Sequence, residues 1–411
     1  MPLYDDAMQI VNNALFAAKP DEAVKKALEN INLKDKNRVL LISIGKAAWH
    51  MAKAASSVLG ERIDGGVVIT KYEHSEGEIP PLKIYEAGHP VPDENTILAT
   101  DAALSAVENL SEDDAVLFLV SGGGSALFEK PKVSLKELKD ITTQLLKKGC
   151  DIVETNTIRK RLSYVKGGQF ALKCEPAHVY AIVLSDILGD PLDMIASGPA
   201  YPDSATSDDA KAIIKKYSLE LSPEAMELMK VETPKELNNV TTQITGSVSQ
   251  LCASAKKTAK KLGYKPIILT DTLRCEAREA GSFIASIAEC YQNTEKSLAF
   301  IMGGETIVRV KGSGKGGRNQ EIALAASKVL STCKKTCVFS VGSDGTDGPT
   351  DAAGGYVDNK SLKKFNKAGV SVDEYLLNND AYNALDKIGG LIITGPTGTN
   401  VNDLTVLLIK R

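Results

Sequence analysis

Short apolar runs recur along this chain, and each is followed by a loop of glycine and polar residues. Four of them occupy residues 38–44, 65–70, 113–120 and 179–184. Nearly continuous Val, Ile and Leu are typical of strands that a parallel sheet buries on both faces. Segments with helical apolar spacing separate the runs, as in residues 46–59. The alternation predicts an α/β fold with helices on both faces of a mostly parallel sheet.

A polar stretch at residues 230–243 interrupts this pattern, which then begins again with apolar runs such as 298–302 and 337–341. A chain of 411 residues is also too long for one ordinary core. We therefore predict two Rossmann-like α/β domains with mostly parallel sheets, residues 1–238 and residues 239–411.

The charge balance argues against nucleic acid as the main partner. The formal net charge is −3, whereas binding a phosphate backbone needs a concentrated basic face. No apolar run approaches the roughly 20 residues of a membrane span, and the N-terminus has acids where a signal peptide needs bases. Seven cysteines, an odd number, do not suggest a disulfide framework. We expect a cytoplasmic protein without a membrane partner.

Three consecutive glycines flanked by two serines follow the third apolar run. Glycine lets backbone N–H groups turn toward a phosphate, and a following helix adds its dipole. A tight turn without a ligand is the alternative. We predict an anion site whose ligands are Ser121, Gly122, Gly123, Gly124 and Ser125.

Basic residues form two further candidate sites. Residues 156–168 (NTIRKRLSYVKGG) concentrate positive charge, which on a helix is usually a solvated face. The side-chain amide of Asn156 and the Lys-Gly-Gly turn that begins at Lys166 favour binding instead. We predict that Asn156, Arg159 and Lys166 hold an anionic ligand. Lys46 would stand in a first helical turn, where a cation is unfavourable unless an anion is bound nearby.

Acidic residues follow two strands. Asp186 and Asp190 lie past the fourth apolar run, where a carboxylate can hold Mg²⁺ or accept a hydroxyl proton. Local hydrogen bonding in a turn is the alternative. In the loop SDGTDGPTD we select Asp344 and Asp351 as metal ligands, because Mg²⁺ needs only one or two carboxylates beside phosphate oxygens and water.

The glycine-rich segment GSGKGGRNQ satisfies G-x-G-x-x-G, a weak indication of a nicotinamide dinucleotide. Two predicted strands, the second at residues 307–310, precede it, whereas a dinucleotide motif closes the first βαβ unit of a domain. It also does not fit a Walker A loop, because Lys315 is followed by glycine. It still delivers Lys315 and Arg318, which suit a polyphosphate or a carboxylate; a surface hairpin is the alternative. The later loop TGPTGTNVNDL adds Asn400 and Asn402 after another apolar run, where α/β sheets bind ligands.

Seven motifs stand in order along the chain: SIGKAAWHMA, SGGGSALFEKP, NTIRKRLSYVKGGQFA, LSDILGDPLDMIASGPAYPD, MGGETIVRVKGSGKGGRNQE, SDGTDGPTDAAGG and TGPTGTNVNDL. Together they resemble the class II glycerate kinases, the MOFRL-domain glycerate 2-kinase family. The resemblance extends from about residue 42 to the C-terminus.

The resemblance implies that ATP and Mg²⁺ serve as cofactors to phosphorylate D-glycerate, commonly to 2-phosphoglycerate, in an active-site cleft between two α/β domains. It implies that Lys46 and Arg318 are essential, while Asp186, Asp190 and Asp344 line the cleft. The expected partners are the two substrates; a homodimer is one option for the assembly.

Two other functions stay open at this point. One is an NAD(P)H-dependent hydroxypyruvate reductase that uses the G-x-G-x-x-G segment. The other is a non-catalytic protein that binds a sugar or an anion, which would have little use for so many aspartates.

Overall fold

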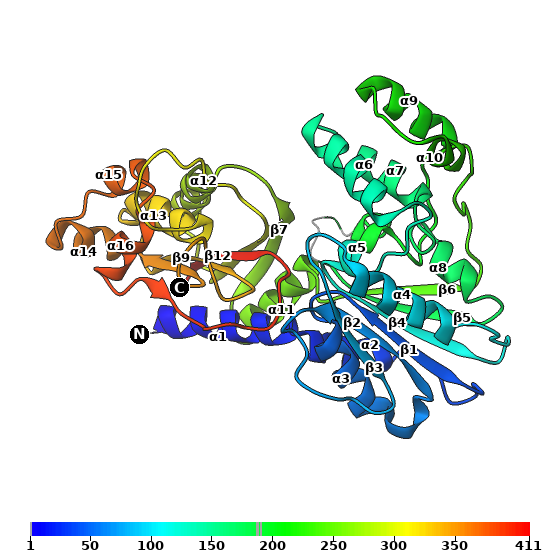
Figure 1. Cartoon of the computed structure of the whole chain (residues 1–411). Coiled ribbons are helices and arrows are strands. Elements are labelled where there is room, and N and C mark those ends of the chain that lie inside the picture. The colour runs from blue at the N-terminus through cyan, green and yellow to red at the C-terminus, as the bar shows by residue number, and fades with distance from the viewer. Residues whose placement is uncertain (1, 186–188, 190) are drawn as a thin grey trace. The chain divides into compact units, whose positions relative to one another are not determined.

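The computed structural model describes residues 2–185, 189 and 191–411, which form two compact units (Figure 1). The first unit contains residues 20–185 and 191–245, and the second contains residues 2–19 and 246–411. Each is built on a six-stranded sheet with helices packed against it. The predicted α/β class with two sheets is confirmed; the cleft predicted between the domains stays a prediction.

The sheet of the first unit is parallel throughout, in the order β3-β2-β1-β4-β5-β6. Its central strands β1 and β4 are entirely buried, as their apolar runs predict. The chain order reverses between these two strands, which makes their carboxyl ends the switch point where such sheets bind ligands. The strands are β1 (Val39–Ile44), β2 (Gly65–Lys71), β3 (Lys83–Ala87), β4 (Ala115–Val120), β5 (His178–Leu184) and β6 (Val240–Thr245).

Helices of the first unit pack on this sheet and also form a small helical layer of their own. Helices α6, α7, α9 and α10 share a separate apolar core that includes Leu138, Ile158 and Ile213. The helices are α2 (Pro20–Leu28), α3 (Ala48–Leu59), α4 (Glu94–Ala106), α5 (Gly124–Leu127), α6 (Leu135–Lys147), α7 (Ile152–Arg161), α8 (Gln169–Lys173), α9 (Ser207–Tyr217) and α10 (Pro223–Leu228), with single turns η1 (Gly60–Arg62) and η2 (Ile195–Ser197).

The sheet of the second unit is mixed, in the order β11-β10-β9-β12-β8-β7. Strands β7 and β8 pair in parallel, but β12 lies between β8 and β9 and is antiparallel to both. An apolar run reports burial and not direction, so the sequence could not show this. The strands are β7 (Lys265–Leu273), β8 (Leu298–Gly304), β9 (Thr336–Gly342), β10 (Gly354–Asp358), β11 (Leu391–Ile392) and β12 (Asp403–Ile409).

Helices α12 and α13 cover one face of the second sheet, and α1 and α11 cover the other (Figure 1). The expected strand at residues 307–310 is extended chain with one isolated bridge, between Glu276 and Ile307. Among the helices that the structure describes, none is long and apolar enough to cross a membrane. The helices are α1 (Pro2–Ala17), α11 (Val248–Lys261), α12 (Ala277–Cys290), α13 (Arg318–Leu330), α14 (Ser361–Lys367), α15 (Val372–Leu377) and α16 (Ala381–Asp386).

Both units differ at their edges from the predicted ranges 1–238 and 239–411. Strand β6 lies beyond residue 238 but pairs with β5, so it completes the first sheet. Helix α1 belongs to the second unit, where the Asp6 carboxylate accepts hydrogen bonds from Tyr264 and Lys410. Contacts distant in sequence set these edges, and a local change in composition does not report them.

Candidate active site

The loops after β1 and β4 are tied together at the switch point of the first sheet. The amide of Lys46 donates to the carbonyl of Gly122 at 2.8 Å. The Ser121 hydroxyl accepts from the amide of Ala47 at 3.1 Å and donates to the carbonyl of Ile44 at 3.1 Å. Ser121 is therefore a bridge between the two loops, and it fixes Lys46 beside the glycine loop.

Gly45 is required for the close approach of the loops that follow β1 and β4. Its φ is +111°, and a Cβ there would lie 2.3 Å from the Ser121 hydroxyl oxygen. Any side chain would separate the two loops.

Two histidines join Lys46 at the glycine loop. A Cβ on Gly123, whose φ is +87°, would lie 3.1 Å from both the His89 ring and the Lys46 Cγ atom. His74 Nδ1 lies 3.1 Å from the carbonyl oxygen of Lys46. The pKa of His89 is lowered by burial and by the charges of Lys46, Lys71 and His74. One lysine and two imidazole rings from three loops thus lie at or near the glycine loop, an arrangement that can bind an anion through the lysine charge and the ring N–H groups.

His89 carried no predicted role, because the groups beside it come from loops distant in sequence. The one local signal was its place in an AGHPVPD loop directly after a strand.

Predicted ligands from two segments meet Ser197, which was not predicted as a ligand, in a second network of the first unit. The Ser125 and Ser197 hydroxyl oxygens are 3.0 Å apart, and Ser197 donates to Asn156 Oδ1 at 2.9 Å. The carbonyl of Ser125 accepts from Arg159 at 3.1 Å and from Lys166 at 2.8 Å. The structure therefore brings four of the predicted residues together, largely through contacts with one another.

Lys166 is fully buried, and its ammonium group is engaged by the protein. It donates to the carbonyls of Ser125 and Phe128 and lies 3.4 Å from a carboxylate oxygen of Glu129, which is also fully buried. Burial lowers the pKa of Lys166 to about 8. These contacts favour a bracing role, in which Lys166 holds the turn that follows the glycine loop.

We expect Lys166→Met to lower the free energy of unfolding by about 3 kcal/mol or more, because Glu129 then loses its nearest cation. The double variant Lys166→Met/Glu129→Leu is expected to recover most of that loss, since the buried carboxylate is removed together with its nearest cation. Arg159, 3.9 Å from Glu129, keeps its hydrogen bond to the Ser125 carbonyl. Urea unfolding followed by circular dichroism measures both. A double variant as unstable as the single one would contradict the pairing.

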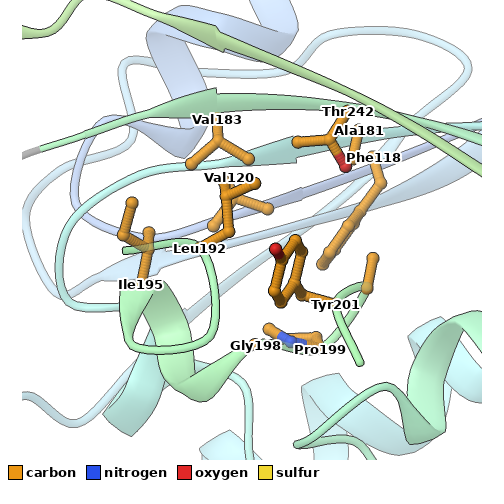
Figure 2. Close-up of a pocket in the computed structure, with 11 residues that line it drawn as sticks. Phe118, Val120, Ala181, Val183, Leu192, Ile195, Gly198, Pro199, Tyr201 and Thr242 are labelled. Carbon is orange, nitrogen blue, oxygen red and sulfur yellow. The ribbon is translucent and has the colours of Figure 1, made fainter. Parts of the chain in front are cut away.

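The segment that carries Ser197 is anchored on the sheet by apolar side chains. Leu192 and Ile195 line a small pocket with Val120 of β4 and Val183 of β5, and Tyr201 lines it with Phe118 (Figure 2). With about 20 Å³ of space it has no room for a substrate. The pocket is packed core that positions Ser197. The predicted catalytic residues Asp186 and Asp190 lie outside the described residues.

Arg318, in the second unit, is held by two carboxylates. Its Nε and NH2 groups donate to Asp403 at 2.6 and 3.0 Å, and NH1 donates to Glu305 at 2.9 Å. Burial disfavours its charge, but Asp403 outweighs burial and raises the pKa of Arg318. The guanidinium is thus fixed in place by a fork-to-fork ion pair.

The N-terminus of α13, which directly follows the G-x-G-x-x-G segment, is already occupied by an anion of the protein itself. Asp347 accepts from the amides of Asn319 at 3.1 Å and Gln320 at 2.8 Å. A Cβ on Gly317 would lie 2.3 Å from the Asp347 carboxyl carbon, so this glycine makes room for the cap. Burial raises the pKa of Asp347 to about 7. The site where a dinucleotide pyrophosphate would bind is therefore filled.

Lys315 and Asp351 meet at Tyr382 of α16. The Lys315 ammonium lies 3.9 Å from the Tyr382 ring centroid, and the Tyr382 hydroxyl donates to Asp351 at 2.8 Å. Asp344, the other predicted metal ligand, accepts from the amide of Thr346 at 2.9 Å and is half-buried. In the described part of the chain no group of three or more His, Cys, Asp or Glu could hold a metal.

A single carboxylate such as Asp344 still fits a magnesium ion that arrives with nucleotide oxygens and water. Of the two predicted amides, Asn400 is exposed, whereas Asn402 is buried in a left-handed turn with its carbonyl accepting from Ser343 at 3.0 Å.

The fold and the first site define an α/β protein in which a lysine lies beside a glycine loop at the switch point of a parallel sheet. Residues 6–230 match the family model "Domain of unknown function (DUF4147)", and residues 298–403 match the MOFRL family. The chain belongs to the class II glycerate kinase family, which carries these two parts.

Similar proteins span nearly the full chain. The D-glycerate 2-kinase of Thermotoga maritima is 54% identical over 98% of this chain and 97% of its own length. The glycerate 2-kinase of Pyrococcus horikoshii is 41% identical, over 100% of this chain and 98% of its own length. An Agrobacterium vitis protein with the name "Putative hydroxypyruvate reductase" is 36% identical, over 98% of this chain and 93% of its own length. The crystal structure of the Thermotoga maritima glycerate kinase matches with a TM-score of 0.93 at 53% identity, over 98% of this chain and 99% of that one.

Proposed function

We propose that this protein transfers the terminal phosphoryl group of ATP to the 2-hydroxyl of D-glycerate, giving 2-phosphoglycerate, with Mg²⁺ as the metal. The observation that carries the proposal is the anion site formed by Lys46, His89 and the glycine loop, in a chain 54% identical to a D-glycerate 2-kinase along almost its whole length.

Phosphoryl transfer needs positioning and charge neutralisation more than covalent chemistry from the protein. Lys46 supplies a positive charge, and the backbone N–H groups of Gly122 and Gly123 can donate to phosphate or carboxylate oxygens, whereas that of Gly124 already donates to the Ser121 carbonyl at 3.3 Å. Arg318 offers a planar fork for the acceptor carboxylate or the transferred group. Mg²⁺ would neutralise phosphate charge beside Asp344.

Asp186 or Asp190 receives the hydroxyl proton of glycerate in this proposal. We expect Asp190→Asn to lower kcat about 10²-fold or more, because the amide cannot accept that proton. Steady-state rates at saturating ATP and glycerate, measured across a magnesium titration, test it. An unchanged kcat with an unchanged magnesium requirement would remove Asp190 from the mechanism.

The function itself is tested by incubating the purified protein with ATP, Mg²⁺ and D-glycerate, and by following ADP with a coupled assay. Phosphorus NMR of the product distinguishes 2-phosphoglycerate from 3-phosphoglycerate. Formation of ADP only when D-glycerate is present, with the 2-phosphate as product, is the expected result. A 3-phosphate product would overturn the regiochemistry alone, and no glycerate-dependent ADP would overturn the activity.

A hydroxypyruvate reductase is the second candidate, since one similar protein bears that name. Asp347 counts against it, because it occupies the helix end that a dinucleotide pyrophosphate would need. Oxidation of NADH by hydroxypyruvate in the absence of ATP would favour the reductase over the kinase. Binding of glycerate without turnover would instead favour a non-catalytic binding protein.

A further inference from the structure

A pocket of about 660 Å³ lies in the second unit, beside Arg318. It is enclosed by the extended chain after β8 (residues 305–310), the glycine-rich loop before α13 and the loop at residues 344–349. Its volume falls in the range of roughly 300–1,000 Å³ that surrounds drug-sized ligands. Glycerate is far too small to fill it, so of the two proposed substrates only ATP has the size.

The charges along the pocket exclude a small anion as its natural ligand. Four carboxylates line it, those of Glu305, Glu321, Asp344 and Asp347, against the one guanidinium of Arg318. Glycerate, or phosphate groups alone, would find a favourable charge only at Arg318 and not along the rest of the lining. A neutral group rich in hydrogen-bond donors is favoured.

Glu321 provides a buried acceptor in this pocket. Its side chain is almost completely buried, and Oε1 accepts from Asn379 at 2.8 Å. Oε2 forms an ion pair with Arg278 at 3.5 Å but has no hydrogen-bond partner among the described residues. The Arg278 guanidinium is a distant partner for this oxygen, and a carboxylate oxygen can accept more than one hydrogen bond, so a ligand hydroxyl or amino group would give it a closer donor.

Apolar side chains line the mouth of the pocket. Ile307 and Val310 are 56% and 76% exposed, and Val308 and Pro349 stand beside them. Exposed branched apolar side chains at the edge of a polar pocket suit the flat face of a ligand ring, because the ring removes them from water.

We propose that this pocket binds the nucleoside half of ATP, with the base against Ile307 and Val310 and a ligand hydroxyl or amino group donating to Glu321. The inference rests on the proposed function for the identity of the nucleotide. A nucleoside combines a neutral aromatic ring with several donors, which the lining requires. Arg318, at the same pocket, then lies at the end toward the phosphates.

The test compares ADP with inorganic tripolyphosphate, which lacks the nucleoside. Isothermal titration in the presence of Mg²⁺, without glycerate, measures both affinities for the wild type and for Val310→Asp and Ile307→Asp. We expect each variant to weaken ADP binding by roughly tenfold or more and to leave tripolyphosphate binding unchanged. Leu377→Asp, at an exposed apolar position of α15, is the matched control and is expected to bind both as the wild type does.

Glu321→Gln is a second variant of nearly the same shape, and thermal unfolding checks that every variant is folded. We expect it to raise the KM for ATP while the KM for D-glycerate stays constant. Equal loss of ADP and tripolyphosphate affinity, unchanged ADP affinity in both Val310→Asp and Ile307→Asp, or a rise in the glycerate KM alone in Glu321→Gln would each overturn the proposal. ADP binding is measured without glycerate, so the two proposals can fail separately. A wild type that binds ADP but does not phosphorylate glycerate refutes the kinase assignment and does not contradict the nucleoside pocket.

Discussion

Lys46→Ala is expected to lower kcat/KM for glycerate phosphorylation by about 10²-fold or more, the effect of removing one preorganised charge from a transition state. The backbone of Lys46 is fixed by the amide contact with Gly122 and by Ser121 between the two loops. Its side-chain stem packs beside Gly123 and His89. The truncation therefore removes the charge from the anion site but leaves the contacts that hold both loops in place.

Steady-state kinetics with ATP and glycerate varied in turn measure this effect. Lys46→Arg should retain part of the activity, because it keeps a charge of different shape. Lys53→Ala, at an exposed position of helix α3, which begins two residues after Lys46, is the matched control and should behave as the wild type. Near-wild-type turnover in Lys46→Ala would remove Lys46 from the catalytic groups.

Arg318→Ala is expected to abolish measurable turnover and also to destabilise the second unit by about 3–5 kcal/mol, because Asp403 is buried and would lose its partner. Arg318→Lys separates the two effects. A lysine keeps the charge beside Asp403, and with it most of the stability, but it cannot make the bidentate fork. We therefore expect Arg318→Lys to be folded and at least about 10²-fold less active.

Thermal unfolding and kcat, measured on the same samples, test this separation. Lys328→Ala, which removes an exposed cation from the same helix, is the control for loss of charge from α13. An Arg318→Lys variant with wild-type kcat would show that Arg318 stabilises the second unit and takes no part in the reaction.

Much of this protein follows from local patterns in its sequence. Apolar runs of strand length predicted the α/β class and the buried central strands β1 and β4, because a strand that is buried on both faces is apolar at nearly every position. Glycines after β4 likewise predicted a loop able to face an anion, since a run of glycines has few other uses at that place. Lys46 was selected because a cation is unfavourable at the start of a helix.

Other features depend on contacts between residues far apart in the chain, and only the tertiary structure decided them. Strand β12 enters the middle of the second sheet, and α1 joins that same unit although almost 230 residues separate it from α11. Lys166 was predicted as a ligand, and only the structure shows that its side chain is buried against Glu129.

The G-x-G-x-x-G segment shows the same division at one helix end. The glycines are visible in the sequence, but the groups that approach them come from other loops. Gly317 makes room for Asp347, which caps α13, and Gly312 and Gly314 make room for Asn378 and Asp380. Local composition determines which segments are strands, helices and flexible loops. Which charge meets which partner, and which polar group is buried, depends on the packing of the whole chain, because burial and electrostatic energy are properties of the neighbours in space.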